Sequence, residues 1–187
     1  TFTNALLSTK ELSDKYANEV LGLIAKNNGE ITIKSDLLKS YIRENYSDIV
    51  MVSSTTKCIL DWEELNNELS EDYKLVVLDF RKNADFDFLK KIKKPHKIEL
   101  LVNEDCFSES MHRERHYRDI SENILLYDRM PDTEYYCPGK CKDLYDSFKQ
   151  ETTIKADDLY GKYYNMGFCH AKLRGRRSDY YDVLESY

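Results

Sequence analysis

The stretch IELLVNEDCFSESMHRERHYRDI, residues 98–120, joins a short apolar run directly to a polar segment that holds two histidines and three arginines. Residues 98–102 suit a buried strand. They are followed at once by Asn103, Glu104 and Cys106, side chains that bind ligands or metals. Several α/β folds place their chemistry where a strand ends in such residues. The stretch therefore predicts a strand that delivers polar side chains to a functional site.

Similar apolar segments recur along the chain, and most of them are followed by an amphipathic segment. The middle ones are continuous runs of Val, Ile and Leu, as expected for parallel strands covered on both faces. Helix starts are signalled by Ser8 with Glu11, by Asp61 with Glu64 and by Asp85. Strands that alternate with helices predict a parallel α/β sheet. The six expected strands are TFTN (1–4), EITIKS (30–35), IVMVSST (49–55), KLVVLDF (74–80), KIELLVN (97–103) and FCHAKLRGR (168–176).

The ends of these segments favour a barrel over a doubly wound sheet. Nearly all of them finish in polar residues or are followed by them, such as Asp79 in the fourth segment and Arg81 directly after it. Polar groups that converge from every C-terminal end suit the mouth of a TIM barrel, whereas a doubly wound sheet concentrates its site near one switch point. The alternative is that each Ser, Thr, Asn or Asp only caps the next helix.

An eight-unit barrel needs at least about 200 residues. The 187-residue chain is therefore expected to form one incomplete TIM-barrel-like domain, residues 1–187, with about six βα units. Between 128 and 158 the rhythm breaks into an irregular excursion that contains two cysteines and two prolines. Long irregular segments in compact domains are usually functional or disordered, and the cysteines favour function here.

Composition narrows the class of protein. The chain is 41% hydrophobic and 33% charged, which is ordinary for a globular protein, and no apolar run approaches the roughly 20 residues of a membrane span. We expect a cytoplasmic protein without a membrane partner, and, because the first residue is Thr, a piece of a longer chain. The net charge of −6 argues against wholesale binding of nucleic acid, so an RNA partner would need a local basic patch.

The cysteines carry the strongest chemical signal. CPGKC places Cys137 and Cys141 in one Pro/Gly loop, a spacing that lets two thiolates reach one metal or cluster. Cys106, at a strand end, would point to the same barrel mouth. We expect the other two cysteines, Cys58 and Cys169, to be buried and structural.

A second candidate site is HRERH, in which His112 and His116 would share one helix face. Together with Cys137 and Cys141 they could form a tetrahedral Cys2His2 zinc site. The alternative is a solvated, charged helix whose histidines lie on the surface.

A third candidate is GFCHAKLRGRR, residues 167–177, where His170, Lys172 and Arg174 alternate along a strand and face one way. Basic residues on an inner face would be costly in a dry core, but they suit a polar barrel interior that holds a carboxylate or a phosphate. The alternative is an exposed edge strand decorated with charge.

Two of these motifs together resemble the collagenase-like TIM-barrel family, whose members were first described as peptidases. In relatives the strand-end pattern reads Asn, two residues, Cys, three residues, Cys-Pro, one residue, Arg, two residues, His. Here Asn103, Cys106, Arg113 and His116 fall on that pattern, while Ser110 and Met111 stand in place of Cys-Pro. The later segment is similar to the family's GF..FKIEGR ending, with matches at Gly167, Phe168, Lys172, Gly175 and Arg176 and with Arg174 replacing the acidic residue.

The resemblance implies a TIM barrel and, for several members, a four-cysteine iron–sulfur cluster that serves hydroxylation of ubiquinone precursors or transfer RNA. Carried over, Cys106, Cys137 and Cys141 would be cluster ligands, and Lys172 and Arg176 would belong to the barrel mouth. Ser110 leaves the fourth ligand open. Three thiolates could hold a cluster with one open iron, His116 could substitute, or the site could have been lost.

Three functions follow as hypotheses. The first is a barrel that binds a thiol-ligated metal or iron–sulfur cluster through Cys106, Cys137, Cys141 and His116, and acts in redox or hydroxylation chemistry on a small organic or RNA substrate. Asn103, Glu104, Lys172, Arg174 and Arg176 would bind that substrate. The second is a peptidase-like hydrolase, with zinc held by His112, His116, Cys137 and Cys141. The third is a non-catalytic barrel that binds an anion through Lys172, Arg174 and Arg176.

Overall fold

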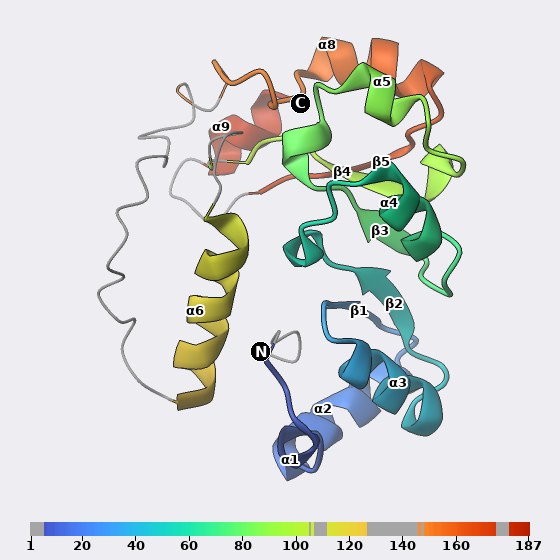
Figure 1. Ribbon diagram of the computed structural model, residues 1–187, viewed down its shortest axis with the longest axis vertical. Coiled ribbons are helices and arrows are strands. Elements are labelled where there is room, and N and C mark those ends of the chain that lie inside the picture. The colour runs from blue at the N-terminus through green and yellow to red at the C-terminus, as the bar shows by residue number, and fades with distance from the viewer. Residues whose placement is uncertain (1–5, 105, 107–111, 127–145, 147, 175–179) are drawn as a thin grey trace.

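Five of the six expected strands are present, and they lie side by side in one parallel sheet (Figure 1). The computed structural model describes residues 6–104, 106, 112–126, 146, 148–174 and 180–187. The expected first strand, at 1–4, lies outside the described residues. The strands are β1 (Glu30–Ile33), β2 (Val50–Ser53), β3 (Leu75–Val77), β4 (Ile98–Leu101) and β5 (His170–Lys172).

Helices and short helical turns join the strands and follow the last one. The α-helices are α1 (Thr9–Leu12), α2 (Lys15–Lys26), α3 (Asp36–Asn45), α4 (Trp62–Glu68), α5 (Phe86–Leu89), α6 (Arg113–Leu126), α8 (Ala156–Asp158) and α9 (Tyr180–Glu185). The 3-10 turns are η1 (Thr55–Lys57), η2 (Phe80–Lys82) and η3 (Pro95–Lys97), and η4 (Leu159–Tyr163) is a π-helical turn.

The strands follow chain order across the sheet, β1-β2-β3-β4-β5, and every neighbouring pair is parallel. In the described part of the chain β1 and β5 form the two edges, so the sheet is open. The C-terminal ends of parallel strands meet at one edge of a sheet. The polar residues that follow these strands therefore share what we call the C-terminal edge.

The helix starts follow the sequence signals. Ser8 and Glu11 make the expected capping box, and the side chains of Asp61 and Asp85 accept hydrogen bonds from the first turns of α4 and α5. The first of these helices is shorter than its pattern indicates. It ends after Leu12, and Asp14 caps a new helix, α2.

The two faces of the sheet are unequal. Alternate residues of the strands, such as Met51, Val76 and Leu100, join side chains of α2 to α5 in the larger core cluster. The residues between them form a smaller cluster on the opposite face, which consists of Val52, Leu75, Val77, Leu101 and Phe80. Helices α2 to α5 therefore cover one face of the sheet, as expected for successive βα units.

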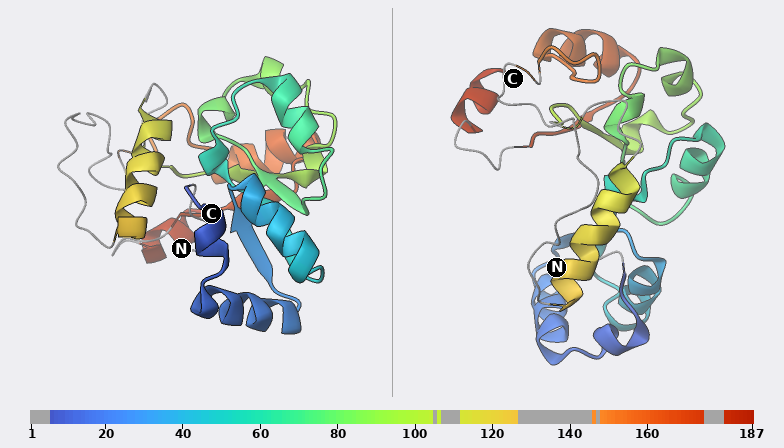
Figure 2. Two further views of the ribbon diagram at one scale, coloured as in Figure 1. Left: turned by 60° about the horizontal axis from the view of Figure 1, so that its bottom comes forward. Right: turned by 60° about the vertical axis from the view of Figure 1, so that its left-hand side comes forward.

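Helix α6 departs from this arrangement. In Figure 1 and in the left view of Figure 2 it stands on the other side of the strands from α3 and α4. Its first residue, Arg113, reaches Glu104 beyond the end of β4. Helix α6 therefore begins at the C-terminal edge and not among the helices of the covered face.

The described helices were also compared with the requirements of a membrane span. None of them combines the necessary length with a sufficiently apolar composition.

Candidate functional site

Five charged side chains meet at the C-terminal edge, and we call them the edge cluster: Asp79, Arg81, Glu104, Arg113 and Arg174. Asp79 lies two residues after β3, Glu104 three residues after β4 and Arg174 two residues after β5. Arg81 belongs to the turn η2, and Arg113 is the first residue of α6. Three successive strand ends and one helix therefore supply the cluster.

Asp79 and Arg81 form a two-pronged ion pair within the edge cluster. The Arg81 guanidinium donates through Nε to Asp79 Oδ1 and through Nη2 to Asp79 Oδ2, both over 2.8 Å. Asp79 Oδ1 also accepts from the backbone N–H of Arg81, so this carboxylate caps the turn η2 as well. The Asp79 side chain is 0% exposed and that of Arg81 is 14% exposed. The hydrogen bonds that Arg81 donates to Asp79, more than any other influence, raise the pKa of Arg81 and keep its charge fixed.

Arg113 is held by two carboxylates and two aromatic rings. Its Nη1 and Nη2 lie 3.4 Å and 3.3 Å from Glu104 Oε2, and its Nε lies 3.7 Å from Asp79 Oδ2. The guanidinium lies over the ring of Phe80 at 4.5 Å and over that of Tyr117 at 4.9 Å. Burial alone would lower the pKa of Arg113, but the neighbouring Tyr117, Glu104 and Asp79 raise it overall.

One nitrogen atom of Arg113 makes no hydrogen bond in this arrangement. Its Nε is buried and has no hydrogen-bond partner among the residues that the structure describes. The side chain as a whole is only 3% exposed. Buried polar atoms are nearly always paired, so each exception calls for an explanation such as a bound ion or ligand. This donor lies inside the edge cluster.

Glu104 and Arg174 close the cluster on the β5 side. Arg174 Nη1 forms an ion pair with Glu104 Oε1, and 37% of the Arg174 side chain remains exposed. Asn103 holds the backbone of Arg174 in place, because its Nδ2 donates to the Arg174 carbonyl at 2.8 Å and its Oδ1 accepts from the Arg174 N–H at 2.7 Å. The Asn103 amide thus extends the β4–β5 ladder by one step.

Arginines outnumber carboxylates among these five described side chains. Three guanidinium groups gather around the carboxylates of Asp79 and Glu104. Arg174 is the most exposed of the five side chains. Arg174 is therefore the guanidinium of the edge cluster that solvent reaches most readily.

The predicted substrate-binding residues fall into two groups. Glu104 and Arg174 belong to the edge cluster, and Asn103 supports it through the backbone. Lys172 lies further back in β5, where its Nζ is 3.1 Å from Glu99 Oε2 of β4. Arg176 lies outside the described residues. The structure therefore brings Glu104 and Arg174 together as expected and places Lys172 in a separate ion pair.

The cysteines differ from expectation in two ways. Cys106 is half-buried at the C-terminal edge, where it packs against the smaller core cluster and lies close enough to interact electrostatically with Arg81 and Arg113. Cys58, expected to be buried and structural, is also half-buried and interacts with the same two arginines. Cys169, expected to face the apolar side of its strand, is exposed, because β5 is an edge strand whose residue Ala171 is exposed as well.

Cys58 is unusual in its backbone. It ends η1 in the left-handed region, with φ 57° and ψ 38°, which is uncommon for a residue other than glycine. Burial raises the pKa of its thiol, and Asp79 adds to that effect, while Arg113 and Arg81 oppose it. Strained backbone of this kind clusters at functional sites. No spacing in the sequence signals it.

The predicted metal site is only partly within the described residues. Cys137 and Cys141 lie outside them. His112 and His116 are exposed at the start of α6, one turn apart, and the His116 ring lies 6.2 Å from that of Tyr117. Within the described ranges no three His, Cys, Asp or Glu side chains form a group that could hold a metal ion. Of the expected ligands that the structure describes, Cys106 lies at the edge cluster and His116 does not, so the cluster-binding hypothesis stays a prediction.

Sequence reasoning noted Asp79 and Arg81 as polar strand-end residues but did not include them, or Arg113, in the site. The segment DFR, residues 79–81, carried a usable signal, since an acid and a base two residues apart at a strand end can pair across a tight turn. Arg113 had no such signal, because its role depends on the path of the chain between Glu104 and α6.

The chain was compared with models of protein families, with curated protein sequences and with solved structures. None of the three comparisons finds a match.

Proposed function

We propose that this chain is part of an incomplete TIM-barrel-like protein that binds a small anionic molecule at the C-terminal edge of its sheet. The strand order supports the barrel, because barrel strands follow chain order around the sheet whereas a doubly wound sheet reverses direction at a switch point. The covering of one face by α2 to α5 supports it too, since the helices of a barrel lie outside the sheet, although α6 stands on the other side of the strands.

The observation that carries the proposal is the edge cluster itself, in which three arginines gather around two carboxylates and the buried Nε of Arg113 has no hydrogen-bond partner among the described residues. Guanidinium groups bind carboxylates and phosphates through paired N–H donors, and such bonds are about twice as strong as neutral ones. Arg174, being the most exposed, would make the first contact with the ligand. Arg81 and Arg113, which are more deeply buried than Arg174, would add positive charge behind the ligand.

The carboxylates have a role in this site beyond neutralising charge. Asp79 and Glu104 fix the planes of three guanidinium groups before a ligand arrives. A pre-organised site loses less side-chain entropy on binding. The geometry thus supports recognition of a planar carboxylate or a phosphate oxygen face, and it assigns a binding role to these residues rather than a catalytic one.

The test is calorimetric titration of the protein with inorganic phosphate and, separately, with succinate as a dicarboxylate probe. We expect one of these anions to bind, and Arg174→Gln to weaken that binding at least about tenfold, which corresponds to the loss of one charge-assisted hydrogen bond. Arg118→Gln is the matched control, because Arg118 is 68% exposed and forms an ion pair with Glu122 on the surface of α6.

If neither phosphate nor succinate binds, the proposal is contradicted. An Arg174→Gln protein that binds as tightly as the wild type and the Arg118→Gln control would contradict it as well.

The second candidate is the iron–sulfur or metal-dependent redox function, and one observation favours it. Cys106 lies at the same edge, close to Arg81 and Arg113, whose positive charges would attract an anionic cluster. Cys106 is the described residue that would hold such a group, and Cys137 and Cys141 are the predicted further ligands. When bound, a cluster would supply one-electron chemistry to a small organic or RNA substrate.

Metal analysis with an absorbance spectrum, on protein purified without oxygen, tests the second candidate. Iron and acid-labile sulfide near about four per chain would support a cluster, and Cys106→Ser should lower both while the exposed-site control Cys169→Ser should not. Zinc near about one per chain would instead favour the zinc hydrolase hypothesis with His112 and His116. Protein free of both metals would leave anion binding as the function.

A further inference from the structure

A lysine-rich segment lies at the edge of the sheet opposite the edge cluster. The sequence FLKKIKKPHKI, residues 88–98, contains five lysines and one histidine and no acidic residue. We call Lys90, Lys91, Lys93, Lys94 and Lys97 the basic segment. It runs from the end of α5 through η3 into the first residue of β4, which places it at the N-terminal edge of the parallel sheet.

The charges of the basic segment are largely uncompensated. Lys90 pairs with Asp87 at 3.3 Å, but no carboxylate of the described residues forms an ion pair with the other four lysines. The Nζ atoms of Lys94 and Lys97 both lie 3.3 Å from the same carbonyl oxygen, that of Leu69. Burial, and next the neighbouring charge of Lys94, lower the pKa of Lys97. A bound anion would relieve this repulsion.

An aromatic ring borders the basic segment. The Nζ of Lys91 lies 5.6 Å from the ring of Trp62, which is partly exposed at the start of α4. Trp62 is the single tryptophan of the chain. Positive charge along a backbone path together with an aromatic ring is the combination that binds single-stranded nucleic acid, because phosphates meet the charges and a base can stack on the ring.

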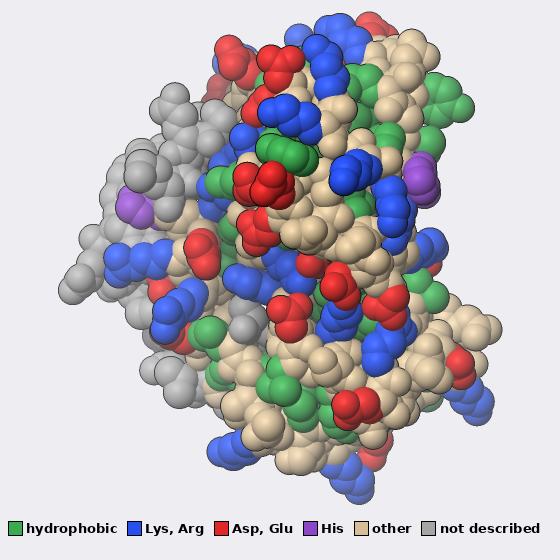
Figure 3. All heavy atoms as spheres, turned by 45° about the vertical axis from the view of Figure 1, so that its right-hand side comes forward, with side chains coloured by type: hydrophobic (Ala, Val, Ile, Leu, Met, Phe, Trp, Pro, Cys, Tyr) green, Lys and Arg blue, Asp and Glu red, His purple; other side chains and the backbone are tan. Residues whose placement is uncertain are grey.

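We propose that the basic segment is a docking surface for the phosphate backbone of single-stranded RNA. Membrane binding fits less well, because the apolar side chains within the segment, Phe88 and Ile92, are buried in the core and cannot insert into lipid. Figure 3 shows Lys and Arg side chains gathered beside an exposed histidine on this side of the molecule. The surface is independent of the anion site, from which it is separated by the length of the strands.

Trp62 fluorescence tests the proposal directly. Titration with a 20-nucleotide uridine RNA at low salt should quench the tryptophan of the wild-type protein. Lys91→Glu together with Lys93→Glu should weaken the binding about tenfold or more. Each neutralised phosphate contributes about 0.7 to the dependence of log affinity on log salt, so this double variant should show a salt dependence shallower by about 1.4.

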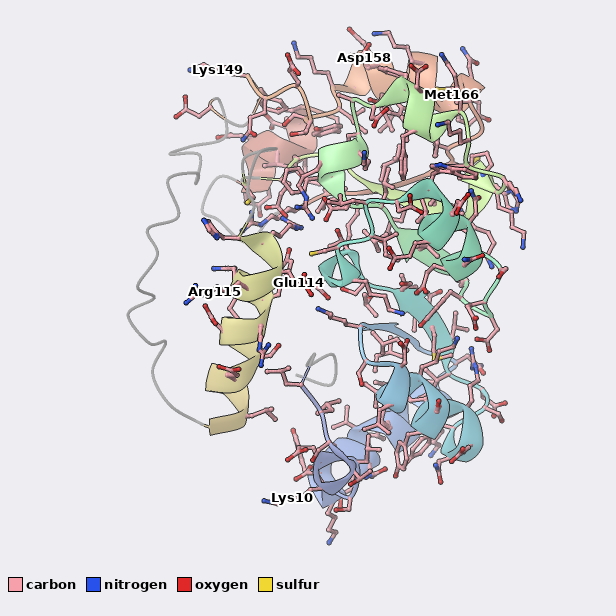
Figure 4. All side chains as sticks on the ribbon, in the orientation of Figure 1. Lys10, Glu114, Arg115, Lys149, Asp158 and Met166 are labelled. Carbon is pink, nitrogen blue, oxygen red and sulfur yellow. The ribbon has the colours of Figure 1, made fainter. Side chains whose placement is uncertain are left out.

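The matched control is Lys10→Glu with Lys26→Glu, which changes the net charge equally. Lys10 lies at the far end of the molecule from Met166 (Figure 4), and a Cβ added to the next residue, Gly167, would lie 3.0 Å from Pro95, which stands between Lys94 and Lys97. The control should bind RNA within about twofold of the wild type. If the Lys91→Glu, Lys93→Glu protein fails to fold, the milder Lys91→Gln, Lys93→Gln protein replaces it and should bind more weakly than the wild type.

Three results would overturn the proposal. The first is the absence of RNA-dependent quenching in the wild type. The second is equal weakening by the test and control variants, which would mean that net charge alone governs binding. The third is quenching by phosphatidylserine vesicles but not by RNA, which would assign the surface to an anionic membrane.

Discussion

At the scale of single residues, Arg113 shows why the edge cluster is both costly and specific. A guanidinium that is only 3% exposed loses its hydration, and it regains stability from two carboxylates and from the rings of Phe80 and Tyr117. Burial also raises the pKa of Tyr117, so its phenol stays neutral beside the guanidinium. Arg113 therefore stabilises the cluster only as long as all of these partners stay in place.

Replacing Arg113 by Met tests this dependence. The apolar stem is kept, but the two buried carboxylates lose a counterion, and breaking a buried ion pair typically costs about 3–5 kcal/mol. We expect a loss of that size in the free energy of unfolding, measured with urea. Arg118→Met, on the exposed side of the same helix, should change it by less than about 0.5 kcal/mol. Equal effects of the two substitutions would contradict the role given to Arg113.

At the scale of elements, the backbone just beyond β5, at Arg174, is held by a side chain that follows β4. Asn103 is 3% exposed, and its amide both donates to and accepts from the backbone of Arg174. This pairing sets the direction in which Arg174 leaves the strand toward Glu104. Asn103 was predicted to bind substrate, but its two amide atoms are engaged with the protein.

The substitution Asn103→Ala would leave the N–H and the carbonyl of Arg174 without these partners. Unpaired buried polar groups cost about 1–3 kcal/mol each, and the partial exposure of Arg174 lets water recover part of this. We expect a loss of about 2 kcal/mol in the free energy of unfolding, together with faster hydrogen exchange at the Arg174 amide. Asn45→Ala, which removes an exposed amide on α3, is the control and should lose less than about 0.5 kcal/mol. Unchanged exchange at Arg174 would argue against the pairing.

The start of α5 gives a prediction about pH. Asp85 Oδ1 accepts from the N–H of Phe88 and Oδ2 pairs with Lys82, each at 3.0 Å. The backbone bond first, and then Lys82, lower the pKa of Asp85 below its ordinary value of 3.8. Because the pKa is lower in the folded state, the stabilisation is present above about pH 4 and is lost as the pH falls through the folded pKa.

Comparison of Asp85→Ala with the wild type measures that stabilisation. At pH 7 the variant should be about 1 kcal/mol less stable in urea, the usual value of an N-cap. The difference should shrink as the pH is lowered from 5 to 3. Asp85→Asn keeps a capping oxygen without a charge, so its stability relative to Asp85→Ala should stay constant over the same range. A wild-type advantage that persists undiminished at pH 3 would contradict this account.

At the scale of the whole molecule, the larger core cluster connects strands β1 to β4 to their helices. The larger core cluster runs from Leu21 in α2 to Phe168 just before β5 and includes side chains of α3, α4 and α5. The two edges of the sheet carry different chemistry, with the edge cluster at the C-terminal ends and the basic segment at the N-terminal ends. A single core of this kind is expected to unfold in one step.

Unfolding in urea, followed by Trp62 fluorescence and by far-ultraviolet circular dichroism, tests this unity. Trp62 packs against the larger core cluster from α4, while circular dichroism reports on all helices. We expect the two transitions to coincide within experimental error, with the same midpoint and the same slope. Two separated midpoints would mean that part of the chain folds independently of the main core.

The sequence by itself determined the five described strands, their parallel direction and the polar character of the edge where they end. Continuous runs such as residues 75–78 and 98–102 can be buried only as covered strands, and the caps at Ser8, Asp61 and Asp85 mark the helices between them. These signals are local, because each depends on residues only a few positions apart.

Only the tertiary structure decided which polar residues meet. Asn103 and Arg174 are 71 positions apart in the sequence, and Arg113 reaches Asp79 and Glu104 from a helix on the other side of the strands. The exposure of Cys169 and the strained backbone of Cys58 were likewise decided by the position of β5 at the sheet edge and of η1 at the C-terminal edge. Pairings between buried charges depend on strand register and on the path of α6, and neither is encoded in a local pattern of residues.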